Sequence, residues 1–178
     1  MGQAGVVLVR REVANDVGVI DQVHRQAFAA GAPQGSEPIE VGLVHALRAD
    51  PGWVPALSLV AEVGAQVVGH VVCSKGAIDG TAVVGLGPIA VLPDHQGRGV
   101  GDALMHAVLG AADALEYPVV GLLGSVDYYP RYGFVPASEL GIAAPDPAWG
   151  AHFQARTLAT YRTTIVGSFR YAAPFDAL

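Results

Sequence analysis

The 178 residues suit one domain, and 52% hydrophobic against 15% charged residues is the composition of a globular core. The formal net charge is −6 and the basic residues occur singly or as the pair Arg10-Arg11, which argues against nucleic acid as a partner. The apolar stretches are shorter than the ~18 residues of a membrane span and the N-terminus lacks a secretory signal, so we expect one cytoplasmic domain over residues 1–178 and no membrane partner.

The first part of the chain predicts a strand followed by two helices. The apolar residues 6–10 predict the strand, and Asn15-Asp16 can cap a first helix that ends near Phe28. Glycines and prolines in residues 31–38 then predict a loop. Apolar residues recur at helical spacing from 39 to 47, which predicts the second helix.

Three β-rich runs follow, at residues 57–61, 66–73 and 82–92, and their short turns predict an antiparallel meander. The third run contains Gly87 and Pro88, which weaken a strand or remove a donor from its ladder. We therefore expect this strand to bulge or to splay from a neighbour, although a distorted edge strand would carry the same residues.

The second half of the chain begins with a predicted βαβ unit. Residues 99–115 have the apolar periodicity of a helix, and the fully apolar run 119–123 is typical of a buried parallel strand. Residues 127–132 can form a short helix, and residues 152–160 and 168–171 are further strand candidates.

Residues 96–101, Gln-Gly-Arg-Gly-Val-Gly, lie between the predicted third strand and its helix, where free backbone N–H groups and the helix dipole favour an anion such as phosphate. A tight turn without a ligand is the alternative. The glycine spacing does not match the dinucleotide fingerprint, because its last position would be Asp102 or Leu104, and a P-loop lysine is absent.

Two segments resemble the GNAT acetyltransferase family. Residues 88–104 are similar to the strand and pyrophosphate loop of that family, whose loop has the form Gln/Arg-x-x-Gly-x-Gly/Ala, and residues 128–134, Tyr-Tyr-Pro-Arg-Tyr-Gly-Phe, are similar to its segment after the fifth strand. The ending, residues 171–178, resembles a bacterial YhbS-type subgroup. The resemblance implies an α/β fold in which a mixed, mostly antiparallel sheet has helices on both faces, a splayed central strand and a βαβ cofactor unit.

The resemblance also implies acetyl-CoA as the co-substrate. The backbone of the splayed strand would hold the pantetheine arm and the acetyl carbonyl, and the loop amides would hold the pyrophosphate. The implied cofactor-binding residues are Ile89, Ala90, Val91, Gln96, Gly97, Arg98, Gly99, Val100 and Gly101.

Tyr129 matches the family tyrosine that protonates the departing thiolate, and a phenol with a reference pKa of ~10 is protonated at neutral pH. Simple packing is the alternative for this residue. The general base that deprotonates the amine is open between Glu62, His70, Asp127 and a water chain. His70 lies within a strand, where a hydrogen-bonded structural role is the more common one.

The expected reaction is direct transfer of an acetyl group from acetyl-CoA to a primary amine of a small-molecule or peptide acceptor. One alternative is an enzyme that uses a longer acyl-CoA, and the size of the pocket near Ile89 and Leu123 would decide between the two donors. Another alternative is a regulatory module that binds CoA but does not catalyse transfer. We expect residues 31–38 and 136–149 to shape the acceptor site. No metal is expected, because Cys73 stands alone and the six histidines are scattered, and a late exposed strand leaves a homodimer open.

Overall fold

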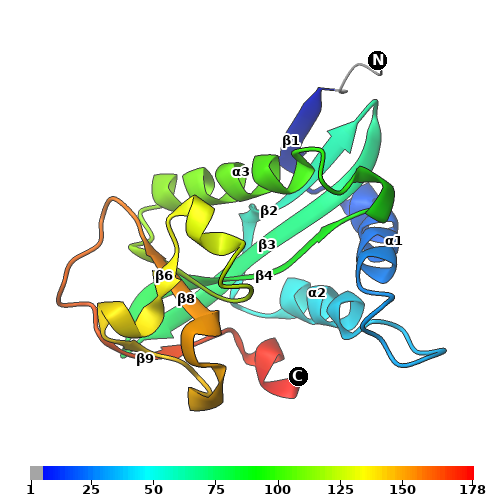
Figure 1. Cartoon of the computed structure of the whole chain (residues 1–178). Coiled ribbons are helices and arrows are strands. Elements are labelled where there is room, and N and C mark those ends of the chain that lie inside the picture. The colour runs from blue at the N-terminus through cyan, green and yellow to red at the C-terminus, as the bar shows by residue number, and fades with distance from the viewer. Residues whose placement is uncertain (1–5) are drawn as a thin grey trace.

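A computed structural model describes residues 6–178, which form a mixed sheet with helices on both of its faces (Figure 1). The strands follow the order β1-β2-β3-β4-β5-β8-β6, with β9 beside β3 and β7 beside β9. None of the helices in residues 6–178 has both the length and the hydropathy needed to cross a bilayer. The strands are β1 (Val7–Arg11), β2 (Trp53–Val63), β3 (Gln66–Ile78), β4 (Thr81–Val91), β5 (Val119–Leu123), β6 (Val135–Pro136), β7 (Ile142–Ala143), β8 (Phe153–Thr157) and β9 (Gly167–Arg170). The helices are α1 (Val17–Ala27), α2 (Ile39–Ala49) and α3 (Val100–Ala114).

Strands β2, β3 and β4 form the antiparallel meander that the sequence predicts. β4 then leads through α3 into β5, and β4 and β5 pair in parallel, which confirms the βαβ unit. A parallel pair needs such a crossover because the chain must return to the same end of the sheet before it starts the second strand.

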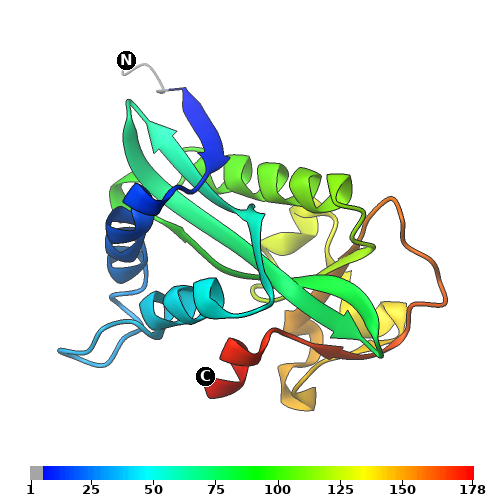
Figure 2. The same ribbon diagram turned by 180° about the vertical axis from the view of Figure 1, so that it is seen from behind.

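The sheet separates two layers of the core, and helices cover each layer. Apolar residues recur every three or four positions in α3, and Val100, Leu104 and Val108 bury that stripe on one face of the sheet. α1 and α2 cover the opposite face, which Figure 2 shows from behind, with Ile20 and Val44 fully buried there. The sheet is therefore covered on both faces around β3 and β4.

The distortion predicted for the third strand of the meander is present in β4 and has two parts. Gly87 and Pro88, joined by a cis peptide bond, lie opposite Val72 alone, so β4 bulges against β3. On its other side, β4 pairs with β5 only at Val84 and Gly85. Beyond Gly85 the two strands diverge, and the last part of β4 has a free edge.

Strands β2 and β3 are longer than their sequence patterns indicate. β2 begins at Trp53 although Pro55 interrupts its apolar run, and the register is irregular between Trp53 and Ser58. β3 continues past Cys73 to Ile78 because its polar end pairs with the first part of β4 and with β9. Pairing to two neighbours overrides the weak local preference of Ser74 to Gly76 for a strand.

Candidate active site

The glycine loop before α3 exposes a row of unpaired backbone amides. Gly97 and Gly99 have φ values of 68° and 82°, a left-handed conformation that favours glycine, and an added Cβ would meet no atom within 4 Å at either. Ala103 is the first residue whose N–H donates within the helix, to the Gly99 carbonyl at 3.0 Å. Within residues 6–178, no backbone N–H from 97 to 102 donates to a protein acceptor, so these amides and the helix dipole create an anion site.

The free edge of β4 presents backbone groups of alternate residues. Leu92 donates its N–H to the Val68 carbonyl on β3 at 2.8 Å. Backbone groups alternate sides along a strand, so the N–H and C=O groups of Ile89 and Val91 face away from β3 toward the gap. The Gln96 side chain reaches back to the Val91 carbonyl, with 3.0 Å between Nε2 and O. The glycine loop and the free edge thus border the same space.

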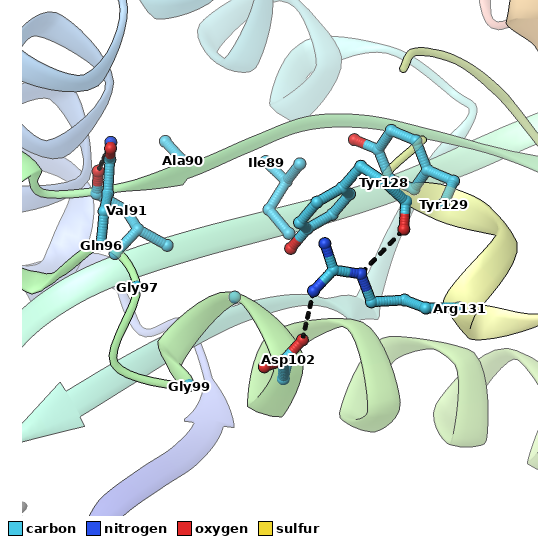
Figure 3. A pocket seen from close by; sticks show the side chains of 11 residues that line it. Ile89, Ala90, Val91, Gln96, Gly97, Gly99, Asp102, Tyr128, Tyr129 and Arg131 are labelled. Atoms are coloured by element: carbon cyan, nitrogen blue, oxygen red, sulfur yellow. Dashed lines mark hydrogen bonds and ion pairs between the residues drawn. The ribbon is translucent and has the colours of Figure 1, made fainter. Parts of the chain in front are cut away.

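That space is a cavity of about 480 Å³ between β4, the start of α3 and the short helix Tyr129–Tyr132 (Figure 3). Most of the residues implied by the family resemblance gather around it. Arg98 is exposed and Val100 is buried in the core, and neither side chain lines the cavity. The lining residues are Ile89, Ala90, Val91, Gln96, Gly97, Gly99, Gly101, Asp102, Tyr128, Tyr129 and Arg131.

Arg131 is the cation of this lining and was not among the residues expected there. Its guanidinium lies over the Tyr128 ring, 4.2 Å from the centroid, and its Nε donates to the Tyr128 carbonyl at 3.0 Å. Nη1 is 3.9 Å from Asp102 Oδ1, and a dashed line marks this ion pair in Figure 3. The side chain is 53% exposed, so its charge is available to an anion at the glycine loop. The one sequence feature that could have indicated Arg131 as a lining residue is its position in segment 128–134, which resembles the family.

Tyr129 borders both this cavity and a second one. Its ring makes edge contacts with Tyr128 and Phe134, at centroid distances of 5.0 and 5.9 Å. Gly124 leaves room for the ring, because a Cβ there would overlap it. Burial, with a smaller contribution from Tyr128, raises the pKa of Tyr129 to about 12. The phenol is therefore protonated at neutral pH and can donate a hydrogen bond.

The second cavity, about 500 Å³, lies on the α1 and α2 face of the sheet. Its walls are largely aromatic and aliphatic, and Glu40 is the one acidic or basic side chain among them. Of the two segments expected to shape the acceptor site, residues 136–149 contribute Trp149 to its lining, whereas no residue of 31–38 lines either cavity. The lining residues are Phe28, Ile39, Glu40, Leu43, Leu86, Gly87, Pro88, Ile89, Leu123, Tyr129, Trp149, Tyr171, Phe175 and Leu178.

The expected candidates for a general base lie outside the lining of both cavities. Glu62 is engaged by Arg10, with 2.6 Å between Nη2 and Oε1, and Asp127 is exposed. His70 is fully buried and hydrogen-bonded, as a structural histidine would be. Direct proton transfer from an amine in either cavity to one of these three side chains therefore has no support in the geometry.

His70 belongs to a buried polar network that the sequence did not indicate. Its Nε2 lies 2.9 Å from Ser58 Oγ and 3.2 Å from Glu12 Oε2, and its Nδ1 lies 2.8 Å from His24 Nε2. Arg48 Nε donates to Glu12 Oε1 at 2.7 Å. Because the carboxylate only accepts, we assign the His70 proton to Nε2, so that His24 donates to His70 Nδ1. The network links the two helices to β2 and β3.

Burial keeps both histidines of the network neutral. It lowers the pKa of His70, although the hydrogen bond that His70 donates to Glu12 opposes this shift, and it lowers the pKa of His24 to about 3. Burial also disfavours the charge of Glu12, but hydrogen bonds with His70, Arg48 and Ser58 outweigh it and lower the pKa of that carboxyl to about 2. The network therefore holds one carboxylate and two neutral imidazoles.

Neither a reactive thiol nor a cluster of metal ligands is found in the part of the chain that the structure describes. Cys73 is fully buried in β3, and burial raises the pKa of its thiol, which makes it a small core residue and not a nucleophile. Within residues 6–178, no three His, Cys, Asp or Glu side chains gather as metal ligands would.

The chain matches known acetyltransferases in sequence and in fold. Residues 55–136 match the model of the acetyltransferase (GNAT) domain. The uncharacterized N-acetyltransferase YjhQ of Escherichia coli (strain K12) is 33% identical over 168 residues, which cover 90% of this chain and 89% of YjhQ.

Two solved structures share the fold over nearly the whole chain. The GNAT family N-acetyltransferase YhbS from Escherichia coli, in complex with CoA, superimposes with a TM-score of 0.87 at 29% identity and covers 99% of this chain and 95% of its own. A GNAT family acetyltransferase from Brucella melitensis, in complex with acetyl-CoA, has a TM-score of 0.77 at 33% identity and covers 97% and 99%. With its splayed β4, its glycine loop and these relatives, the chain belongs to the GNAT acetyltransferase family.

Proposed function

We propose that this protein transfers the acetyl group of acetyl-CoA directly to a primary amine. The observation that carries the proposal is the junction of three features in one cavity: the free edge of β4, the unpaired amides of residues 97–102 and the protonated Tyr129. The CoA and acetyl-CoA complexes of the two structural relatives support the choice of donor.

The residues of the cavity suit each part of acetyl-CoA. The amides before α3 and the Arg131 guanidinium would bind its pyrophosphate, because both present positive charge to phosphate oxygens. The backbone groups of Ile89 and Val91 would pair with the amide-bearing pantetheine arm as a neighbouring strand does. Acetyl-CoA supplies an activated thioester whose carbonyl carbon an amine can attack.

The same residues would assist the transfer itself. The Ile89 N–H would stabilise the negative charge that develops on the acetyl oxygen during attack. Tyr129 would donate a hydrogen bond to the departing sulfur, which its neutral phenol can do at physiological pH. The proton of the attacking amine would leave through water, since Glu62, His70 and Asp127 lie outside the lining of both cavities.

A longer acyl-CoA is a second candidate donor, and one observation favours it. Ile89 lines both cavities, and the second one is apolar and is also bordered by Leu123, so an acyl chain could extend past the thioester into it. Thiol release from acetyl-, propionyl- and hexanoyl-CoA, measured with a panel of primary amines, tests both donors. We expect the highest kcat/KM with acetyl-CoA, and a higher value with hexanoyl-CoA would reverse the assignment of the donor.

The same assay tests turnover against simple binding. A catalytically silent module would bind acetyl-CoA in calorimetry but would release no thiol with any amine of the panel. We expect thiol release that depends on the amine. Mass spectrometry should detect a product about 42 Da heavier than the amine, because one acetyl group replaces one hydrogen.

A further inference from the structure

The second cavity has a charge pattern that restricts what it can bind. Among its lining residues Glu40 has the one acidic side chain, and no Lys or Arg lines it. A ligand carboxylate would therefore enter without a cation to pair with it, and removal of an unpaired carboxylate from water is costly. An ammonium group would instead meet a carboxylate of opposite charge.

Glu40 is half-buried and unpaired in the first turn of α2. No hydrogen bond or ion pair joins its carboxylate to another of residues 6–178. Its neighbour Glu37, by contrast, is exposed and already paired with Arg25. Glu40 is thus the acidic group on this part of the chain that remains available to a cation in the cavity.

Three aromatic rings that contact one another line the same cavity. Tyr171 stacks on Phe175 with 4.5 Å between ring centroids, and Trp149 meets Tyr171 edge-on at 6.4 Å. These contacts hold the three rings against one another, so they line the cavity with aromatic carbon. A planar apolar group gains both burial and stacking against such a wall.

We propose that the acceptor is an arylalkylamine: a primary amine with one positive charge, an aromatic body and no carboxylate. This inference rests on the proposed function, because the reacting nitrogen must lie near Ile89 and Tyr129, which border both cavities. The aromatic body then lies against Trp149 and Tyr171, and Glu40 draws the ammonium into the cavity. An alkyl chain as occupant would leave the Glu40 carboxylate without a partner.

Calorimetric titration of the CoA-loaded protein with three amines tests the inference without requiring turnover. We expect 2-phenylethylamine to bind, phenylalanine to bind at least tenfold more weakly because it adds a carboxylate to the same body, and spermidine to bind more weakly because it lacks an aromatic group. Absence of binding by 2-phenylethylamine, or equal binding by phenylalanine or spermidine, overturns the inference.

Variants of residues that line the cavity test whether 2-phenylethylamine binds there. Glu40→Gln should weaken 2-phenylethylamine at least fivefold, and Trp149→Ala should weaken it further, whereas the matched control Glu37→Gln should leave it unchanged. An unaltered affinity of Glu40→Gln contradicts the assigned role of the carboxylate. Thermal unfolding of each variant confirms that it is folded, and the isosteric Glu40→Gln change keeps the test valid if Trp149→Ala is unstable.

The two proposals fail in different ways. If 2-phenylethylamine binds with the expected variant pattern but no thiol is released, the cavity is an arylalkylamine-binding site and the proposed transfer is wrong. If hexanoyl-CoA in place of CoA abolishes 2-phenylethylamine binding while acetyl-CoA does not, the amine and an acyl chain compete for one cavity, which supports its assignment as the acceptor site. If hexanoyl-CoA has no effect on the amine, that assignment is contradicted.

Discussion

At the residue scale, Tyr129 connects the two cavities and carries the sharpest chemical expectation. Its ring is held by Tyr128 and Phe134, and partial burial raises the pKa of its hydroxyl to about 12. Removal of that hydroxyl takes away a hydrogen bond to the departing sulfur but leaves the ring contacts intact. The hydroxyl therefore matters to the transfer more than to the fold.

For Tyr129→Phe we expect kcat to fall about 100-fold, at the lower end of what one general acid contributes. The affinity for CoA and the midpoint of thermal unfolding should change little, because phenylalanine keeps the ring. Steady-state kinetics measures the change in kcat, and calorimetry with CoA measures the affinity. An unchanged kcat would remove the proposed role of the hydroxyl.

Gly124→Ala tests the position of the same ring by a different route. A Cβ at Gly124 would overlap the Tyr129 ring, so the ring must move and kcat should fall by an amount similar to that of Tyr129→Phe. Gly110→Ala in α3 is the matched control, because a Cβ there meets nothing within 4 Å and a helical alanine should stabilise the fold by about 0.5–1 kcal/mol. Loss of activity in both variants would contradict this explanation.

At the element scale, the start of α3 holds the proposed phosphate site, and Gly99→Glu tests it. A glutamate there places a carboxylate before unpaired amides and should abolish CoA binding in calorimetry. Gly35→Glu is a matched control, because Gly35 has nearly the same φ of 81°, equally open space and a place outside the lining of both cavities. Both variants should lose about 1–2 kcal/mol of stability from backbone strain.

The outcome that contradicts the phosphate site is equally specific. CoA should bind the Gly35→Glu protein as it binds the original chain, whereas measurable binding of similar affinity by Gly99→Glu would mean that the pyrophosphate lies elsewhere. Circular dichroism of the two variants separates lost binding from lost structure.

The buried network that joins α1 and α2 to the sheet predicts how stability depends on pH. The pKa of His24 is about 3 in the folded protein against about 6.5 when unfolded, so the unfolded chain binds more protons as the pH falls below 6.5. The stability from neutral His24 is thus present above pH 6.5 and is lost on acidification. Between pH 8 and pH 5 the loss should be about 2 kcal/mol from His24 alone.

Urea unfolding at pH 8 and pH 5 measures this loss. Glu12 adds little to it, because its pKa of 4.5 in the unfolded chain lies below that range and the unfolded chain takes up its proton mainly below pH 5. In His24→Gln, which keeps a side-chain donor toward His70, the loss between the two pH values should be smaller. An equal loss in both proteins would show that His24 does not remain neutral when buried.

At the scale of the whole molecule, local patterns predicted most elements because their apolar periodicity coincides with their burial. The helix predicted at 99–115 is α3, Val100–Ala114, and the apolar run 119–123 is β5. The extensions of β2 and β3 could not be predicted, since the end of β3 pairs with Trp53 and with β9, which lie far from it in the sequence, and Pro55 lies in an irregular part of the β2–β3 register. Long-range pairing has no local signature.

The candidate site likewise contains residues that the sequence predicted and residues that it did not. The residues of the glycine loop and of the free β4 edge were predictable, because a continuous motif carries them. The second cavity was not predictable. Its residue Glu40 comes from α2, whereas Tyr171 and Phe175 come from the last residues of the chain, and they meet only in the folded state. The role of His24 beside His70 depends likewise on the packing of α1 against β3.

A crystal structure of this protein with acetyl-CoA tests the central claim most directly. We expect the pyrophosphate on the backbone amides of residues 97–102, the pantetheine arm along Ile89 and Val91, and the acetyl group beside Tyr129 with its methyl toward the second cavity. Acetyl-CoA bound outside the gap between β4 and β5, or with its acetyl group away from Tyr129, would contradict the account.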